Sequence, residues 1–240
     1  MDITNRLLAM DKSLTLHNEG EWSTGVSEYS AFNDAGIECE VGEYLYGLVR
    51  ILKPKRILET GTHVGIGASY LGMGLKDNKK GKLDTIEFLS DIYKQAVNRI
   101  STMELNDYVI CHYGDAKDFI PPEDWQGSNE TIQDVGLPQP RVQYDMILLD
   151  TEPQTRFAEF EKFYPYLREG GYIFIHDLFR HMHQVPNVEH GFAWPFGKIT
   201  PFITEKVGDG SVRPFHFETP RGLSGFYKVS EKDFKFTKKT

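Results

Sequence analysis

The chain has 240 residues, 40% hydrophobic and 26% charged, which excludes wholesale disorder and favours one large domain over two. Its net charge of -8 disfavours a nucleic-acid partner, because an acidic surface repels phosphate backbones. Two cysteines, Cys39 and Cys111, supply neither a disulfide framework nor a zinc ribbon. The sequence also lacks a signal peptide and any run of about 20 apolar residues, so we expect a cytoplasmic protein without membrane contact.

Short apolar runs alternate with helical patterns along most of the chain. Residues 1–40 are predicted as an accessory or lid segment, and residues 41–240 as the main domain. Within the main domain, the patterns predict strands at 56–59, 83–88, 108–113, 146–149 and 172–175, with a terminal antiparallel pair at 214–219 and 225–229. Helices are predicted from Val41 to Pro54, from Ser90 to Met103, and over 157–167 up to Gly170-Gly171. Strands that alternate with helices favour a parallel sheet covered on both faces.

Two segments depart from this alternation. Residues 121–143 are rich in Pro, Gly, Gln and Asn and are predicted as a surface insertion. Residues 178–203 carry Phe192, Trp194, Phe196 and Phe202 among prolines and glycines. These aromatic side chains could wall an apolar substrate pocket or form a satellite core on the sheet.

The most informative motif is a glycine turn after the first predicted strand. Glu59 is followed by Gly61, Gly65 and Gly67, with the spacing G-x-x-x-G-x-G. Glycines let the backbone turn tightly and approach a ligand, and the following helix N-terminus favours polar groups. A dinucleotide fingerprint needs G-x-G-x-x-G, so the spacing does not favour bound NAD. The alternative is an ordinary strand-to-helix turn.

The segment from Glu59 to Gly65 resembles the first motif of the class I S-adenosylmethionine-dependent methyltransferases. The resemblance extends over residues 41–230 and implies a Rossmann-like, doubly wound α/β fold with a mixed seven-stranded sheet and helices on both faces. It implies that Glu87 binds the ribose hydroxyls, which a carboxylate can accept, and that Asp115 and Ala116 line the adenine. The other cofactor-binding residues that it implies are Glu59, Gly61, Thr62, Gly65, Ser69 and Asp150.

Asp150 and Asp177 end two strands that the family's sheet order makes neighbours. Two carboxylates on one rim suit Mg²⁺ or Ca²⁺, which prefer oxygen ligands, and we expect one pKa to rise if no ion lies between them. Catechol-type and sugar-type O-methyltransferases look similar here. The sequence departs from the catechol pattern at Leu178, where that family has a carboxamide, and at Pro153, where it has a lysine. The metal is therefore a hypothesis that rests on the two acids.

These features predict methyl transfer from S-adenosylmethionine to a hydroxyl of a small molecule. Asp150 is the first candidate for the catalytic base or metal ligand, and Asp177 is the second. Glu152, His176 and His181 are weaker candidates for the base. His176 adjoins Asp177, and adjacent strand residues point to opposite faces, so the two need not share a pocket. His176, His181 and His183 are further candidates for metal ligands, but solvated loop residues are the favoured interpretation of His181 and His183.

Three alternatives stay open. The first is a metal-free N-methyltransferase, and the second is a methyltransferase-like domain that binds without catalysis. The third, a nucleic-acid methyltransferase, is disfavoured because residues 150–153 do not match the polar-Pro-Pro-aromatic motif of the amino-directed enzymes. A homodimer is compatible with the sequence.

Overall fold

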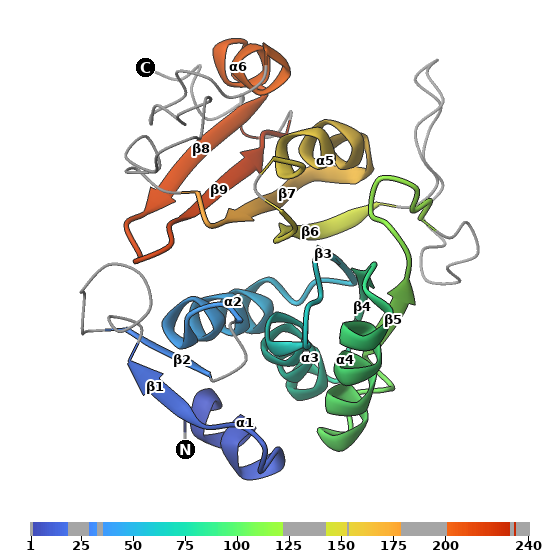
Figure 1. Ribbon diagram of the computed structural model, residues 1–240. Coiled ribbons are helices and arrows are strands. Elements are labelled where there is room, and N and C mark those ends of the chain that lie inside the picture. The colour runs from blue at the N-terminus through green and yellow to red at the C-terminus, as the bar shows by residue number, and fades with distance from the viewer. Residues whose placement is uncertain are drawn as a thin grey trace, which may run out of the picture.

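A seven-stranded sheet forms the centre of the protein (Figure 1). The computed structural model describes residues 2–18, 29–32, 36–121, 143–152, 154–178, 201–230 and 233. The strands lie in the order β5 (Val109–Tyr113), β4 (Lys82–Glu87), β3 (Arg56–Thr60), β6 (Tyr144–Leu149), β7 (Leu167–His176), β9 (Leu223–Lys228) and β8 (Val212–Phe217). Strands β3 to β7 pair in parallel, whereas β9 is antiparallel to both β7 and β8. This arrangement confirms the predicted mixed α/β sheet.

Helices cover both faces of the sheet. One hydrophobic core joins the sheet to α2 (Cys39–Leu52), α3 (Ile66–Asn78) and α4 (Ser90–Thr102). A second core joins it to α5 (Arg156–Phe163), the 3-10 turn η2 (Tyr164–Tyr166) and α6 (Pro201–Gly208). Successive residues of β3 show the division, since Ile57 belongs to the first core and Leu58 to the second. Every residue of β3 is buried, as expected for a parallel strand between two helical layers.

The N-terminal segment packs on the first of these layers. It contains α1 (Ile3–Met10) and a short antiparallel pair, β1 (Leu16–Asn18) with β2 (Ser30–Phe32), which lie beside α2 in Figure 1. Leu7 and Phe32 are fully buried in the same core as α2 and α3. Arg6 also pairs with Asp77 of α3 at 2.6 Å. The segment is therefore joined to the domain by both apolar and ionic contacts.

The structure corrects two predicted boundaries and adds one helix. Gly170-Gly171 does not separate a helix from a strand, because β7 already begins at Leu167 and includes both glycines. The pairing of β6 with β7 is irregular near this point, where a Cβ on Gly171 would lie 2.9 Å from the Asp145 carbonyl oxygen. Helix α6 was not predicted, and Ser90 is the first residue of α4 rather than its cap.

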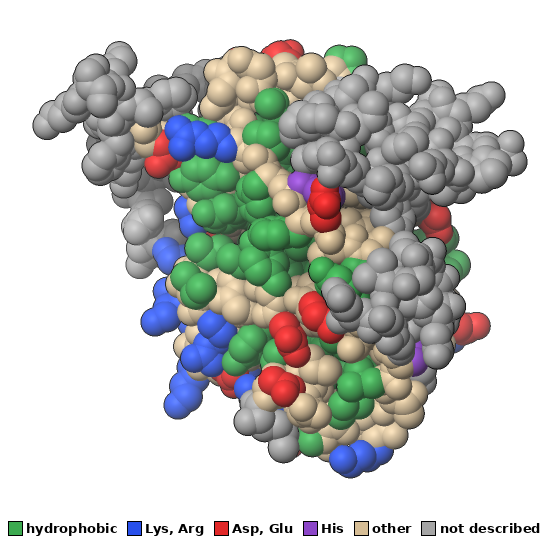
Figure 2. Space-filling model, turned by 90° about the vertical axis from the view of Figure 1, so that its left-hand side faces the viewer, with side chains coloured by type: hydrophobic (Ala, Val, Ile, Leu, Met, Phe, Trp, Pro, Cys, Tyr) green, Lys and Arg blue, Asp and Glu red, His purple; other side chains and the backbone are tan. Residues whose placement is uncertain are grey.

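Aromatic contacts join α2 to the strands β7 and β8. The Tyr44 ring lies 4.7 Å from that of Phe217 and 6.3 Å from that of Phe174, measured between centroids. Figure 2 shows apolar side chains gathered on the side of the molecule where α2 and β8 lie. Among the helices that the structure describes, none is long and apolar enough to cross a membrane.

Candidate functional site

A cavity of about 690 Å³ lies at the carboxyl edge of the sheet. Its walls come from the residues that end or follow β3, β4, β5 and β6, together with the start of α3 and one face of α5. Gly36, Ile37, Asp177 and Arg221 reach it from other parts of the chain. Open α/β sheets bind their ligands at this edge, so the cavity is the candidate active site.

Gly61 lets the turn after β3 pack against the end of β6. It has a positive φ of 77°, and a Cβ there would lie only 2.2 Å from the Asp150 carbonyl oxygen. The backbone N–H groups of Gly61 and Thr62 both donate to the Ile86 carbonyl at 3.0 Å. Any other residue at position 61 would force these segments apart, because only glycine tolerates both the conformation and the contact. Gly61 and Thr62, which the sequence predicts to contact the cofactor, both line the cavity.

Gly65 and Ser69 do not line the cavity, in contrast to the sequence expectation. The Ser69 side chain is fully buried, and its hydroxyl donates to the Gly65 carbonyl within the first turn of α3. Gly65 has a positive φ of 88°, and a Cβ there would lie 3.3 Å from the Cα of Ala96 in α4. These two residues shape the start of α3 and its packing on α4, and their direct contact with a cofactor stays a prediction.

Glu59 is a buried carboxyl in the wall of the cavity. Its side chain is 1% exposed, and it accepts a hydrogen bond from the Thr85 hydroxyl. Burial raises the pKa of Glu59 to about 8; the Thr85 hydrogen bond works against this rise, and the negative charges of Asp150 and Glu87 add to it. The carboxyl is therefore largely protonated at neutral pH when no ligand is bound.

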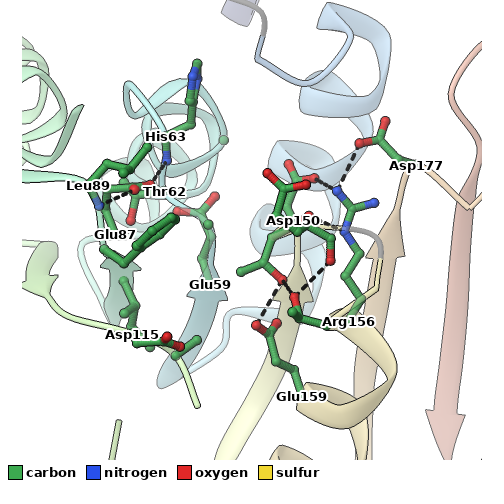
Figure 3. A pocket seen from close by; sticks show the side chains of 18 of the residues that line it. Glu59, Thr62, His63, Glu87, Leu89, Asp115, Asp150, Arg156, Glu159 and Asp177 are labelled. Atoms are coloured by element: carbon green, nitrogen blue, oxygen red, sulfur yellow. Dashed lines mark hydrogen bonds and ion pairs between the residues drawn. The ribbon is translucent and has the colours of Figure 1, made fainter. Parts of the chain in front are cut away.

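Glu87 lies on the opposite side of the cavity from Asp150 and Arg156 (Figure 3). Its carboxylate oxygens accept the backbone N–H groups of His63 and Leu89, each at 2.8 Å. Each oxygen keeps a free lone pair, so the carboxylate is held in one orientation and can still accept hydrogen bonds from a ligand.

Asp115 and Ala116 line the cavity after β5. The Asp115 carboxylate accepts the Lys117 backbone N–H at 2.9 Å and pairs with the Lys117 ammonium at the same distance. The Asp115 side chain is 42% exposed at the rim of the cavity. Through its two contacts with Lys117, the carboxylate stabilises the local turn.

Asp150 and Asp177 share a cation at the ends of β6 and β7. The strands are neighbours, as predicted, and the Arg156 guanidinium lies 3.4 Å from Asp150 and 3.0 Å from Asp177 (Figure 3). Burial works to raise the pKa of Asp177. The positive charges of His176, Arg156 and Arg221 outweigh burial and lower that pKa. The expectation that one of two unshielded carboxylates would titrate upward is therefore wrong for Asp177.

His176 contacts the Asp150 carboxylate but does not itself line the cavity. Its side chain is 1% exposed; Nδ1 lies 3.1 Å from an Asp150 oxygen, and Nε2 lies 2.6 Å from a Glu38 oxygen. Burial works to lower the pKa of His176, but Asp150, Asp177 and Glu38 raise it well above its ordinary value. Because the imidazole is buried and does not line the cavity, this arrangement favours Asp150 over His176 as the base that faces a substrate.

A left-handed backbone brings His176 and Asp177 into one cluster. Asp177 follows the last residue of β7 and has a φ of 52°, so the alternation of side chains along the strand stops there. Asp150, His176 and Asp177 each offer one ligand atom, and these three atoms lie within 4.8 Å of one another. However, the Arg156 guanidinium pairs with both carboxylates, so a positive charge already lies between them. In this arrangement the cluster does not fit Mg²⁺ or Ca²⁺.

The remaining predicted residues differ in how much the structure says of them. Glu152 lines the cavity with an exposed side chain. Pro153, His181, His183 and the aromatic segment 192–196 lie outside the described residues.

The sequence reasoning missed several residues that shape the cavity: Glu38, Arg156, Glu159, Lys162 and Arg221. Glu38 is fully buried, and besides His176 it accepts the Arg221 backbone N–H at 2.9 Å. Nothing in the local sequence marks Glu38. The three-residue spacing of Arg156, Glu159 and Lys162 beside a phenylalanine stripe is a signal that could have marked a polar helix face.

Solved structures with the same fold include several methyltransferases. The O-methyltransferase TomG of Streptomyces achromogenes, solved with S-adenosylmethionine, aligns with a TM-score of 0.62 and 20% identity over 82% of this chain and 83% of that one. An O-methyltransferase of Bacillus cereus, solved with S-adenosylhomocysteine, aligns with a TM-score of 0.58 and 23% identity over 80% and 83%. The methyltransferase PaMTH1 of Podospora anserina, also bound to S-adenosylhomocysteine, aligns with a TM-score of 0.61 and 17% identity over 95% of each chain.

A family model described as a methyltransferase domain matches residues 58–178, which is half of the chain. The matched segment runs from β3 to the residue after Asp177 and so includes most of the cavity walls. The chain therefore belongs to this family of methyltransferase domains, and it shares the fold of methyltransferases solved with S-adenosylmethionine or S-adenosylhomocysteine.

Proposed function

We propose that the protein transfers the methyl group of S-adenosylmethionine to a hydroxyl of a small molecule. The observation that carries the proposal is the position of Asp150, whose carboxylate faces the cavity and is held by Arg156 on one side and His176 on the other. Two of the structural relatives reported above are named O-methyltransferases, which supports oxygen as the acceptor atom.

The cofactor is proposed to lie across the cavity from Glu87 to Asp150. Glu87 would accept the ribose hydroxyls, and the turn at Asp115 and Ala116 would line the adenine. The methionine part would lie along Glu59 and the Gly61 turn, where the start of α3 favours a carboxylate.

The chemistry needs little from the protein beyond alignment and a proton acceptor. The sulfonium is already electrophilic, so the acceptor oxygen forms a bond to the methyl carbon as the carbon–sulfur bond breaks. Asp150 would orient the acceptor hydroxyl and take up its proton. Because the cluster does not fit a divalent ion, no step of this mechanism uses a metal.

The first experiment is calorimetric titration of the protein with S-adenosylhomocysteine and with NAD. We expect micromolar binding of the first, about -8 kcal/mol, and none of the second. Glu87→Ala should weaken binding by about 1.5–3 kcal/mol, because two ribose hydroxyls lose a charged acceptor. NAD binding without any response to S-adenosylhomocysteine would contradict the proposal.

The second experiment screens phenols, sugars and amines as acceptors, in chelator and with added Mg²⁺ or Ca²⁺. O-methylated product should form in chelator, and Asp150→Asn should lower turnover more than Glu152→Gln does. An amine product would favour the N-methyltransferase alternative. Activity that is lost in chelator and restored by the ion would return Asp150 and Asp177 to the role of metal ligands.

A further inference from the structure

One face of α5 is a row of charged side chains directed to the cavity. Arg156, Glu159 and Lys162 follow one another at intervals of three residues, and all three line the cavity. The neighbouring stripe, Phe157, Phe160 and Phe163, is buried in the core beneath the sheet. The phenylalanines fix how the helix is rotated, so the charged row is held against the cavity by the core.

Each member of the row reaches a different part of the cavity wall. Arg156 contacts the Asp150 and Asp177 carboxylates at one end. Glu159, in the middle, accepts the hydroxyls of Thr60 at 2.6 Å and Thr151 at 2.9 Å. Lys162 donates to the carbonyl oxygens of Ala116 at 2.8 Å and Lys117 at 2.6 Å, at the other end. The row therefore spans the site from the predicted reaction centre to the predicted adenine end.

Lys162 is the member whose chemistry the proposed reaction does not use. Its ammonium is partly buried, and burial lowers its pKa. It reaches across 45 residues of sequence to two carbonyls of the turn that follows β5. On the other side of the same turn, the Gly114 N–H donates to the Glu87 carbonyl at 2.9 Å. The turn is thus held from β4 and from α5, and the Lys162 bonds are charge-assisted.

We propose that Lys162 is a positioning residue that holds the turn over residues 114–117 at the distance required to bind the adenine end of the cofactor. The inference rests on the proposed function, because that function places adenine at this turn. Without the ammonium, two carbonyls lose their donor and the turn can move from α5. Since packing contacts weaken steeply over gaps below 1 Å, a small movement is enough to reduce affinity.

The chain offers a control in Lys94 of α4, which does not line the cavity. Its ammonium pairs with Asp91 at 3.0 Å on the surface, and its side chain is 68% exposed. Lys94→Met removes the same charge without touching the turn or its contacts to α5. Lys162→Met removes the two bonds and keeps most of the apolar stem, whereas Lys162→Arg keeps a cationic donor.

The experiment is calorimetric titration of the three variants and the wild type with S-adenosylhomocysteine and with 5′-methylthioadenosine, well below each melting temperature. We expect Lys162→Met to raise both Kd values about tenfold, a loss of about 1.4 kcal/mol. Lys162→Arg should recover most of this loss, and Lys94→Met should leave both Kd values unchanged. Equal loss for both ligands places the effect at adenosine, because 5′-methylthioadenosine lacks the amino-acid group.

Several outcomes would overturn the inference. Unchanged affinity in Lys162→Met, with or without a lower melting temperature, would leave Lys162 a purely structural role. An equal loss in Lys94→Met would show a general effect of charge, and a loss for S-adenosylhomocysteine alone would place the effect at the amino-acid end. If Lys162→Met does not fold, Lys162→Gln is titrated with the same criteria. A wild type that binds neither ligand contradicts the proposed function itself, and so is distinguished from a failure at Lys162.

Discussion

Glu59 makes the ligand-free protein sensitive to pH. Its pKa is raised from 4.5 to about 8 in the folded state, so between these values the folded protein binds more protons than the unfolded chain. The contribution of this carboxyl to stability is therefore complete at low pH, falls as pH rises from about 4.5, and is lost above about 8. The size of the loss is on the order of a few kcal/mol.

The test at this residue is Glu59→Gln, which stays neutral and can still accept the Thr85 hydroxyl. We expect its melting temperature, relative to the wild type, to rise steadily from pH 5 to pH 9. Glu104→Gln removes a carboxylate that is 82% exposed and should follow the wild-type profile. Parallel profiles for the wild type and Glu59→Gln would show that Glu59 is ionised in both states.

At the scale of the element, α5 places the Arg156 guanidinium between the ends of β6 and β7, where a metal ion would otherwise lie between Asp150 and Asp177. Arg156→Met leaves Asp150 and Asp177 without their shared guanidinium, and the loss of one partner from a buried ionic cluster costs about 3–5 kcal/mol. We expect millimolar Mg²⁺ or Ca²⁺ to raise the melting temperature of this variant and not that of the wild type.

Thermal denaturation in chelator and in each ion provides the comparison. Arg156→Lys is the matched control, because it restores a positive charge and should reduce the response to the ion. A wild type stabilised by the same ion would mean that Arg156 gives way to a metal in the native site.

At the scale of the whole molecule, Glu38 tests whether the N-terminal segment and the sheet unfold together. It precedes α2 yet contacts His176 of β7 and the backbone of Arg221 beyond β8. Glu38→Ala should lower the free energy of unfolding by about 3–5 kcal/mol, because a buried imidazolium loses one of its carboxylates. In urea we expect a single transition, shifted to lower concentration with an unchanged m-value.

Asp2→Ala is the comparison for a local effect in the same segment. It removes only the cap of α1 and should cost about 0.5–2 kcal/mol. Two separate transitions in Glu38→Ala would instead show that the N-terminal segment is an independent accessory unit.

The sequence predicted the sheet well because its signals are local. Glycines and Pro54 interrupt the hydrophobic periodicities where the chain turns, and β3, β4, β5 and β6 lie within two residues of where those patterns placed them. The prediction failed at β7 because a glycine pair reads as a turn, whereas here it lies within an irregular strand start. It also missed α6, which begins at Pro201 at the end of the aromatic segment.

The cavity was predictable only where residues directly follow strands. Glu87, Asp150 and Asp177 lie at the expected edge because parallel strands end together. The cations that pair with these acids were not predictable, since the reach of Arg156 depends on how α5 is rotated on its core. Glu38 was missed for the same reason: its partner is 138 residues away, and no periodic pattern specifies such a contact.

The way in which distant segments close the cavity also has a kinetic consequence. The Gly36 carbonyl accepts a hydrogen bond from the Arg221 guanidinium, which lies 185 residues away in the sequence. The rim of the cavity is therefore complete only after both ends of the chain have joined the sheet. Contacts of such separation form late, because loop closure must precede them. A ligand of the finished cavity should therefore leave the refolding arm of a chevron plot unchanged and slow the unfolding arm. Bound cofactor would then lengthen the lifetime of the native protein without hastening its formation.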